Sequence, residues 1–535
     1  MRRLFRTVSI SGTIATYLHR KCGKMDYYTC TVVLIASLVI FLYQFLKKRY
    51  SFFERCGIPY IKPTILFGNT IDIILLRKSM GEVFAELYKK LEPHRFGGIF
   101  AATKPMIMIR DPNLLKDILI KDFVNFSDRG WDVDHTLEPL TNHLFTMHND
   151  DWRNLRMKLN SVFTSGKLKT MFPLVKVCGD KLSEVIGRIP ENESFDAKDL
   201  MARYATDVIG SCVFGLDTKS MDDPNAEFRM MGRKLSQFRL RSMLRLLQFD
   251  VVPQKLAKLL KITFFDLKTQ HYFGDIVLKT IEQREKTNAK RNDLIDFLIA
   301  MKNGQTSEKY NNVGNGRDFD LKITDELLAA QGFIFFFAGY ETSSTSLSYI
   351  LLELSQKQNK HIQDKIRQEI LDITSANSRL TYDVLKQMPY TDMVIDEILR
   401  KYPPNGILQR RAIKNYKIPN SDAVIPAGTA IIVSIYGLHC DEKYFDNPQE
   451  FRPERFTEEE KSKRLSCTYL PFGTGPRYCI GASFAKIMVK IGLIYALRNY
   501  SYRTSPKMKF PLEFDKNLGL LTPCNSILLQ REKIL

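Results

Sequence analysis

A glycine-rich loop that contains one cysteine is the segment of the chain best suited to chemistry. Residues 471–481 read Pro-Phe-Gly-Thr-Gly-Pro-Arg-Tyr-Cys-Ile-Gly, and an apolar helical pattern follows from Ala482 to Leu497. Cys479 thus lies at the entrance to a helix, where backbone N–H groups and the helix dipole favour a thiolate. Arg477 adds a positive charge nearby. A thiolate in this position can serve as a nucleophile or as a metal ligand.

A long helical pattern from Ile323 to Gln356 carries an acid beside a hydroxyl near its middle. Thr324 can cap its first turn. Glu341 and Thr342 follow an apolar run, and the Thr342 hydroxyl can bond to a preceding carbonyl, so we expect a local distortion there. Taken alone, the pattern also fits a packed core helix with one stray acid. Four residues share one helical face: Phe335, Ala338, Gly339 and Thr342.

Two residue pairs stand at helical spacing elsewhere in the chain. Trp152 precedes Arg156, and Glu397 precedes Arg400, at spacings that place each pair on one helical face. Taken alone, the first pair is ordinary and the second is a common surface ion pair. Their meaning depends on the elements that accompany them.

The elements that must position these residues are mostly helices. Helical patterns dominate from about residue 80 to 400, whereas two short β-rich segments, 99–109 and 430–434, are typical of strands. We therefore expect a mainly α fold with a small β portion. A proline-rich connector lies at 57–63, near the start of residues 50–535. We find no other linker in this range, which indicates one large domain.

Composition excludes several classes of protein. The chain has 535 residues, is 44% hydrophobic and carries a net charge of +20, so it is too apolar to be disordered. The positive charge suits nucleic acid, an anionic membrane or an acidic protein. Zinc-finger spacing, a basic zipper and an aromatic RNA-binding motif are missing, so we expect no nucleic acid partner. None of the nine cysteines forms a C-x-x-C pair, which argues against a zinc or thioredoxin-like centre.

An apolar segment near the N-terminus predicts a membrane anchor over residues 25–49. Residues 27–46 contain no charge and suffice to cross a bilayer as a helix, and Lys47, Lys48 and Arg49 follow at once. A buried core helix and a cleaved signal peptide are the alternatives. A signal peptide would have a shorter apolar region and a small-residue cleavage site.

Residues 1–24 form a basic extension whose role stays open. They contain six basic residues and no acidic one, a composition similar to a mitochondrial presequence. An alternative start at Met25 would leave only Asp26 before the anchor, and the positive-inside rule would then place the rest of the chain in the cytosol.

A basic stretch over residues 233–265 interleaves lysines and arginines with leucines and phenylalanines. Such a segment can lie on a membrane surface or form a solvated helix pair. The anchor favours the membrane.

The cysteine loop resembles the haem-binding loop of the cytochrome P450 monooxygenases. The resemblance implies the P450 fold and Cys479 as the axial thiolate of haem b (iron protoporphyrin IX), with Phe472 packed near the sulfur. Thiolate ligation favours O–O cleavage. The motif at 338–342 is similar to the family's oxygen-binding helix, which implies that Thr342 and Glu341 are catalytic, the first as a hydrogen-bond donor and the second in proton delivery.

Further motifs of the same family occur in the expected order. The resemblance implies that the cofactor's propionates contact the helix of Trp152 and Arg156, and also Arg477 and Arg410, although Arg411 competes for the last position. Guanidinium groups suit carboxylates. The resemblance also implies a buried structural cluster of Glu397, Arg400 and Arg455. Removal of one of these charges would lower the stability of the fold by roughly 3–5 kcal/mol.

The resemblance covers about 510 residues and is nearest to insect microsomal members of the detoxification clan, on motifs at 163–167 and 207–215. It implies a haem-thiolate monooxygenase that inserts one oxygen atom from O2 into apolar xenobiotics or hormone- and lipid-like compounds. NADPH-cytochrome P450 reductase would deliver the electrons, with cytochrome b5 as a second donor, because this chain has no flavin or nicotinamide motif. Candidate contacts for a reductase are Arg153, Lys158 and Lys486.

The sequence also predicts where the protein lies in the cell and leaves other functions open. We expect a haem-thiolate catalytic domain at 50–535 in the cytosol, anchored in the endoplasmic reticulum membrane, with a mitochondrial location as the alternative that residues 1–24 suggest. A haem-thiolate isomerase, a ligand-binding protein and a cysteine-nucleophile enzyme without haem are alternative functions. Residues 405–408, which line the substrate cavity in the family, differ from the usual pattern and leave the substrate open.

Overall fold

The computed structural model describes residues 27–535, apart from 132, 237–257, 261–262, 306–320, 378, 518 and 535. The basic extension at 1–24 and the alternative start at Met25 lie outside the described residues, as does most of the basic stretch at 233–265.

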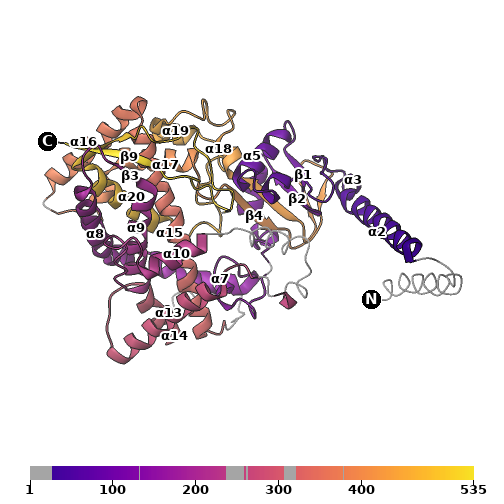
Figure 1. Cartoon of the computed structure of the whole chain (residues 1–535), viewed down its shortest axis with the longest axis horizontal. Helices are drawn as coiled ribbons and strands as arrows, with labels where there is room; N and C mark the ends of the chain where they lie inside the picture. Colours follow the sequence, from indigo (N-terminus) through magenta and orange to yellow (C-terminus); the bar gives the residue numbers. More distant parts are fainter. Residues whose placement is uncertain are drawn as a thin grey trace.

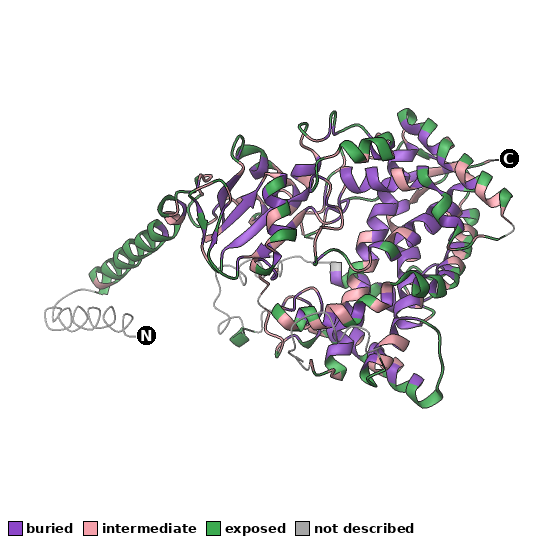
Figure 2. Cartoon of the chain, turned by 180° about the vertical axis from the view of Figure 1, so that it is seen from behind, coloured by how far each residue is buried: buried purple, intermediate pink, exposed green. Residues whose placement is uncertain are grey.

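The N-terminal helix α2 (Tyr27–Tyr50) projects from the body of the molecule (Figure 1). Only Leu46 is buried along its length, and the rest of its surface is mostly exposed (Figure 2). Its 24 residues correspond to about 36 Å, which is long enough to cross a bilayer. The helix continues past the apolar run, because its last turn consists of lysines, an arginine and a tyrosine that tolerate helical backbone.

Helices form most of the body. The shorter ones are α3 (Phe52–Arg55), α4 (Ile71–Ile74), α5 (Met80–Lys90), α6 (Pro112–Lys116), α18 (Ile435–His439) and α19 (Glu458–Lys463). The longer ones are α7 (Asn149–Asn160), α8 (Ser165–Arg188), α9 (Ala197–Ile209), α10 (Glu227–Ser236), α13 (Leu267–Thr287), α14 (Leu294–Lys302), α15 (Asp325–Ser355), α16 (Lys360–Ala376), α17 (Pro389–Lys401) and α20 (Ala482–Leu497).

Helix α15 passes through the middle of the helical body and packs against α9, α13 and α20 (Figure 1). Its first turn is capped as expected, because the Thr324 hydroxyl accepts a hydrogen bond from the Leu327 amide at 3.2 Å. The helix runs from 325 to 355 without interruption. The Thr342 hydroxyl bonds to the Ala338 carbonyl, the preceding carbonyl that the sequence offers it.

The strands form three small sheets. The first has the order β1-β2-β7-β4, the second β3-β9-β8, and the third pairs β5 with β6. Their bounds are β1 (Phe96–Ala101), β2 (Lys104–Ile109), β3 (Ser194–Asp196), β4 (Ile407–Arg411), β5 (Tyr416–Lys417), β6 (Val424–Ile425), β7 (Ala430–Ser434), β8 (Tyr500–Thr504) and β9 (Leu528–Lys533).

The four-stranded sheet lies between α2 and the helical body (Figure 1). The predicted strand at 430–434 is β7, which pairs in parallel with β2 and antiparallel with β4. The segment predicted as one strand at 99–109 is instead a hairpin of β1 and β2, turning at Ala102 with φ 49°. The fold is mainly helical with a small strand portion, as expected.

Two hydrophobic clusters hold the body together. The larger surrounds α15 and includes side chains from α8, α9, α13, α17 and α20, whereas the smaller joins the four-stranded sheet to α5. Buried residues fill the interior of both parts in Figure 2. The loop with Cys479 lies directly before α20 and is thereby fixed to the larger cluster.

Candidate active site

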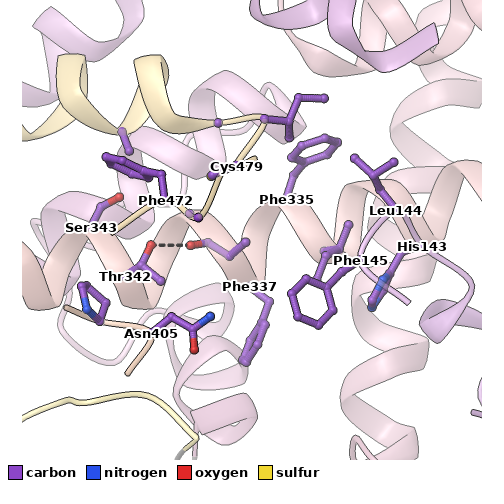
Figure 3. Close-up of a pocket in the computed structure, with 18 of the residues that line it drawn as sticks. His143, Leu144, Phe145, Phe335, Phe337, Thr342, Ser343, Asn405, Phe472 and Cys479 are labelled. Atoms are coloured by element: carbon purple, nitrogen blue, oxygen red, sulfur yellow. Dashed lines mark hydrogen bonds between the residues drawn. The ribbon is translucent and has the colours of Figure 1, made fainter. Parts of the chain in front are cut away.

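A cavity of about 460 Å³ lies between α15, the cysteine loop and the segments around residues 131–146, 264–265 and 404–409. Its wall is mostly apolar and rich in aromatic rings, as ligand pockets commonly are. The labelled part of this wall in Figure 3 shows Phe145, Phe335 and Phe337 on one side of the cavity, with Cys479 and Phe472 on the loop above α15.

Tight turns shape the loop that carries Cys479. Gly473 and Gly475 both have φ +72°, and a side chain at Gly475 would overlap the Leu119 carbonyl oxygen, so these positions suit glycine. The Cys479 amide donates to the Phe472 carbonyl at 3.0 Å, which closes the loop.

The Cys479 side chain is exposed to the cavity, while protein surrounds it on its other sides. Burial raises the pKa of Cys479, and the backbone N–H groups of Gly481 and Ala482, with the charges of Arg156 and Arg129, only partly oppose this rise. The helix entrance therefore does not suffice to keep a free thiolate. A bound metal ion would, because a coordinating thiol is deprotonated.

The described residues contain no cluster of three or more His, Cys, Asp or Glu side chains that could hold a metal ion. All eight described cysteines are free, and three of them are buried: Cys178, Cys212 and Cys467. A metal ion at Cys479 would thus have to bring its other ligands with it, as a macrocyclic cofactor does.

The face of α15 that the sequence predicted does line the cavity, with Phe335, Ala338, Gly339 and Thr342. The Thr342 hydroxyl donates to the Ala338 carbonyl at 2.6 Å (Figure 3). Glu341 is buried with 7% of its surface exposed, and it is not among the residues that line the cavity. Glu341 and Thr342 are neighbours in the sequence, but they lie on different faces of α15, so the hydroxyl reaches the cavity and the carboxyl does not.

Arg477 is buried beside the cavity with all three guanidinium nitrogens bonded. They donate to the carbonyls of Ser127 at 2.9 Å, Leu144 at 3.2 Å and Met147 at 2.7 Å. The guanidinium also stacks 3.9 Å from the centre of the Trp152 ring, which lines the cavity from α7. Arg477 therefore ties the loop to the segment before α7.

Arg410 and Arg411 have different surroundings on β4. Arg411 lies 3.6 Å from the Asp128 carboxylate. Arg410 is 1% exposed, and only its Nη1 has a partner, the carbonyl of Gln409 at 2.8 Å. Its Nε and Nη2 have no hydrogen-bond partner in the described chain.

Arg477 shares the cavity wall with two further arginines, whereas Arg410 lies behind the wall and is not among the lining residues. Arg156, which sequence reasoning selected, projects from α7, and burial lowers its pKa while Cys479 raises it. Arg129 was missed, because it belongs to no motif. Its Nε has no hydrogen-bond partner among the residues that the structure describes, and its guanidinium stacks 4.0 Å from the Phe145 ring centre. Burial and the charge of Arg156 hold the pKa of Arg129 below its ordinary value.

These four side chains form an arginine cluster: Arg129, Arg156, Arg410 and Arg477. None of them has a carboxylate within 4.0 Å among the described residues. Burial comes first and mutual repulsion second in lowering the pKa of Arg410 and Arg477. Buried cations with unpartnered donors are costly, so this arrangement fits a ligand that carries carboxylates.

The cavity also has open space next to the thiol. Gly481 lines the cavity beside Cys479, and a Cβ added there would meet no protein atom within 4 Å. The arginine cluster, the thiol and this open space together match iron protoporphyrin IX, which has a metal at its centre and carboxylates at its edge.

A buried ionic cluster lies behind the loop, as the sequence predicted. Glu397 and Arg400 are fully buried and form two hydrogen bonds of 2.7 and 2.8 Å. Arg455 approaches Glu397 at 3.4 Å. This cluster has no cavity-lining residue and is placed to support the loop rather than to take part in chemistry.

The three candidate contacts for an electron donor differ in accessibility. Arg153 and Lys158 are exposed on α7. Lys486 is only half-buried, but its ammonium group bonds to the Asp396 carboxylate at 2.8 Å and its side chain borders the cavity. The first two are therefore better placed for an external partner.

Comparison with known proteins assigns the family. The sequence model of the Cytochrome P450 family matches residues 58–531. Cytochrome P450 6k1 of Blattella germanica is 35% identical over 505 residues, covering 93% of this chain and 95% of that protein. Probable cytochrome P450 6a13 of Drosophila melanogaster is 37% identical over 505 residues, covering 94% and 98%. Cytochrome P450 6A1 of Musca domestica is 34% identical, covering 94% and 96%.

The family match spans almost the whole described body, including α15, the cysteine loop and the arginine cluster. Proteins of this family bind haem b through a cysteine thiolate and activate O2 for oxidation of small molecules with electrons from a redox partner. The chain therefore belongs to the cytochrome P450 family and is a haem-binding monooxygenase.

Proposed function

We propose that this chain is a membrane-anchored enzyme that inserts one oxygen atom from O2 into apolar small molecules. The observation that carries the proposal is the meeting, on one mostly apolar cavity, of the Cys479 thiol, the Thr342 hydroxyl and three members of the arginine cluster, Arg129, Arg156 and Arg477. Thiol, hydroxyl and guanidinium groups supply the three functions required: a metal ligand, a hydrogen-bond donor and a carboxylate anchor.

Cys479 is the proposed axial ligand, and bound haem supplies the centre at which O2 is activated. Phe472 lines the same cavity as Cys479, and its proposed role is to limit the access of water to the sulfur. Arg410 and Arg156 would receive the propionates. All three guanidinium nitrogens of Arg477 already donate to backbone carbonyls. Its proposed contribution is therefore mainly its positive charge and its stacking on the Trp152 ring.

Thr342 is the proposed hydrogen-bond donor at the reacting face. Its hydroxyl bonds to the Ala338 carbonyl at 2.6 Å, and rotation about χ1 would turn the proton toward the cavity. Glu341 lies behind that face, so its proposed part is to supply protons from the far side of α15 to Thr342. Ser343 and Ser346 also line the cavity and provide hydroxyls along the same helix.

The proposed substrates are apolar molecules, either xenobiotics or hormone- and lipid-like endogenous compounds. The aromatic wall favours them through burial of apolar area. Asn405 lines the cavity and places an amide in its mostly apolar wall (Figure 3). It offers one polar contact to a substrate that carries a hydroxyl or carbonyl group.

The proposed electron source is NADPH, through NADPH-cytochrome P450 reductase, with cytochrome b5 as a second donor. Exposed Arg153 and Lys158 on α7 support the docking of an acidic partner near the arginine cluster. Electrostatic attraction of this kind speeds association at low salt.

We further propose that residues 25–49 anchor the chain in the endoplasmic reticulum membrane and that residues 50–535 form the cytosolic catalytic domain. The exposed apolar surface of α2 supports an anchor, and the basic residues in its last turn favour the cytosolic side for the body. Fractionation of cells that express the full chain tests this. Recovery in mitochondria would contradict the proposal and indicate that residues 1–24 act as a mitochondrial presequence.

Isotope incorporation tests the proposed reaction. The full chain in membranes, with reductase and NADPH, should convert an apolar probe such as a terpene hydrocarbon under ¹⁸O₂ into an alcohol or epoxide that carries one labelled oxygen atom. Thr342→Ala should lower product formation, whereas Thr342→Ser should retain more of it. An isomerised product, or binding without turnover in the presence of active reductase, would contradict the proposal and identify a haem-thiolate isomerase or a ligand-binding protein.

A further inference from the structure

His439, the last residue of α18, is completely buried between two features of the active-site region. Its ring stacks on Tyr469, with 5.4 Å between ring centres and 26° between planes. It does not line the cavity. On one side of it lies the pair of Glu397 and Arg400, and on the other side the loop that leads to Cys479.

Both ring nitrogens of His439 bond to backbone groups, and these partners define its tautomer. Nδ1 lies 3.2 Å from the Arg400 carbonyl oxygen, which can only accept, so Nδ1 carries the hydrogen. The Leu470 amide donates to Nε2 at 2.9 Å, so Nε2 is unprotonated. Burial, and next the charge of Arg400, lower the pKa of His439 to about 3, in keeping with this neutral form.

On the α17 side, the contact between His439 and Arg400 is reciprocal. The Arg400 guanidinium donates to the His439 carbonyl at 3.0 Å, while the His439 ring donates to the Arg400 carbonyl. Arg400 is itself held by both oxygens of Glu397. The ring is therefore fixed to a fully buried and hydrogen-bonded ion pair.

On the loop side, a series of backbone hydrogen bonds continues from Leu470 to the amide of Cys479. Leu470 is 1% exposed, and its carbonyl accepts from the Gly473 amide at 3.0 Å. Phe472, two residues further, accepts from the Cys479 amide at 3.0 Å. An unbroken series of hydrogen bonds and short backbone segments thus joins Glu397 to Cys479, and His439 is its middle member.

We propose that His439 is a positioning residue that holds the loop in place against Glu397 and Arg400 and thereby fixes the Cys479 sulfur relative to the iron. The inference rests on the proposed role of Cys479 as the haem ligand. Without His439, the buried Leu470 amide would lack a partner, and the loop would move to satisfy it. Residues that orient a metal ligand from behind in this way commonly alter metal affinity or activity by about 10–100-fold.

Two conservative substitutions separate the two contacts of the ring. In His439→Gln, the terminal amide oxygen lies near the position of Nε2 and can accept from Leu470, so the loop contact is kept. In His439→Asn, the amide nitrogen lies near the position of Nδ1 and can donate to the Arg400 carbonyl, so only the α17 contact is kept. His439→Phe preserves the ring but neither bond.

Gln363 provides a matched control for loss of a buried polar bridge. It is 3% exposed, donates to the Leu354 and Tyr502 carbonyls at 2.7 and 3.0 Å, and accepts from the Tyr502 amide at 2.7 Å. Like His439 it connects backbone groups inside the core, but none of these groups belongs to the cysteine loop. Gln363→Leu therefore removes comparable bonds without touching Leu470.

The experiment compares these variants of the full chain in membranes by carbon monoxide difference spectroscopy, normalised to total haem, and by haem reduction potential. Per haem, His439→Asn and His439→Phe should lower the ratio of thiolate-type to non-thiolate bands by about ten-fold or more and shift the potential. His439→Gln should stay close to wild-type values, because the loop contact is kept and the bond from the Arg400 guanidinium to the carbonyl of residue 439 does not depend on the side chain. Gln363→Leu should retain wild-type values. Wild-type spectra in His439→Asn, or equal losses in Gln363→Leu, would overturn the inference alone. A wild-type chain without the thiolate band would refute the proposed function and the inference together.

Discussion

Gly475 allows the steric basis of the cysteine loop to be tested quantitatively. Its backbone has φ +72°, and a Cβ would overlap the carbonyl oxygen of Leu119. Gly428, in the turn before β7, has a similar φ of +83°, but a Cβ there would meet no atom within 4 Å. The two glycines thus share a backbone conformation and differ in the space around them.

The expected cost of Gly475→Ala has two parts. The left-handed conformation costs an alanine roughly 1–2 kcal/mol. Overlap with backbone that cannot rotate away adds about 1–3 kcal/mol, the usual range for an overfilled core. Gly428→Ala carries only the first part, so the difference between the two variants, about 1–3 kcal/mol in the free energy of unfolding, isolates the overlap.

Urea unfolding of the purified chain in detergent, followed by tryptophan fluorescence, measures this difference. The chain has two tryptophans, Trp131 and Trp152, and both line the cavity, so the signal reports on the site itself. The carbon monoxide spectrum of each variant shows in parallel whether the loop still presents Cys479. Equal stability of Gly475→Ala and Gly428→Ala would refute the reasoning, because the loop would then have room for a side chain.

Three further substitutions test the cavity. Thr342→Ala should keep consumption of NADPH but lower the product formed per NADPH by roughly ten-fold or more, because the proton donor is lost, and Thr342→Ser should restore it; unchanged coupling in the alanine variant would contradict the assignment. Arg410→Met should accelerate transfer of haem to an acceptor apoprotein by about ten-fold or more, since charge-assisted bonds to carboxylates are lost; an unchanged rate would show that Arg410 does not hold a propionate. Asn405→Leu should weaken binding of hydroxylated or carbonyl-bearing ligands by about 2–10-fold while hydrocarbons of the same shape bind as before, and spectral titration would reveal equal losses for both if the amide has no such role.

Helical spacing predicted the parts of the site that lie on regular helices. The face of Phe335, Ala338, Gly339 and Thr342 does line the cavity, because four positions of one periodic face cannot separate within an uninterrupted helix. The helix over 482–497 has the predicted bounds, since glycine precedes it and the apolar run ends with it. Glu341 lies off the cavity for the same geometrical reason that places Thr342 on it.

Features that depend on tertiary contacts escaped sequence reasoning. The hairpin of β1 and β2 turns at Ala102 and Thr103, which carry no glycine or proline signal. Arg129 stands in no recognisable motif, and only the packing of its segment against the cysteine loop brings it to the arginine cluster. His439 likewise becomes meaningful only when α18 places it between α17 and Leu470.

The central claim is that Cys479 is the thiolate ligand of haem iron, and one measurement tests it most directly. Membranes that express the full chain, Cys479→Ala and Cys467→Ala are reduced, exposed to carbon monoxide and compared by difference spectroscopy. Cys467 is buried and does not line the cavity, so its variant controls for loss of a thiol outside the site. The wild-type chain and Cys467→Ala should show the long-wavelength Soret band of thiolate-ligated haem, and Cys479→Ala should lack it. The same band in Cys479→Ala, or folded wild-type protein without bound haem, would contradict the account.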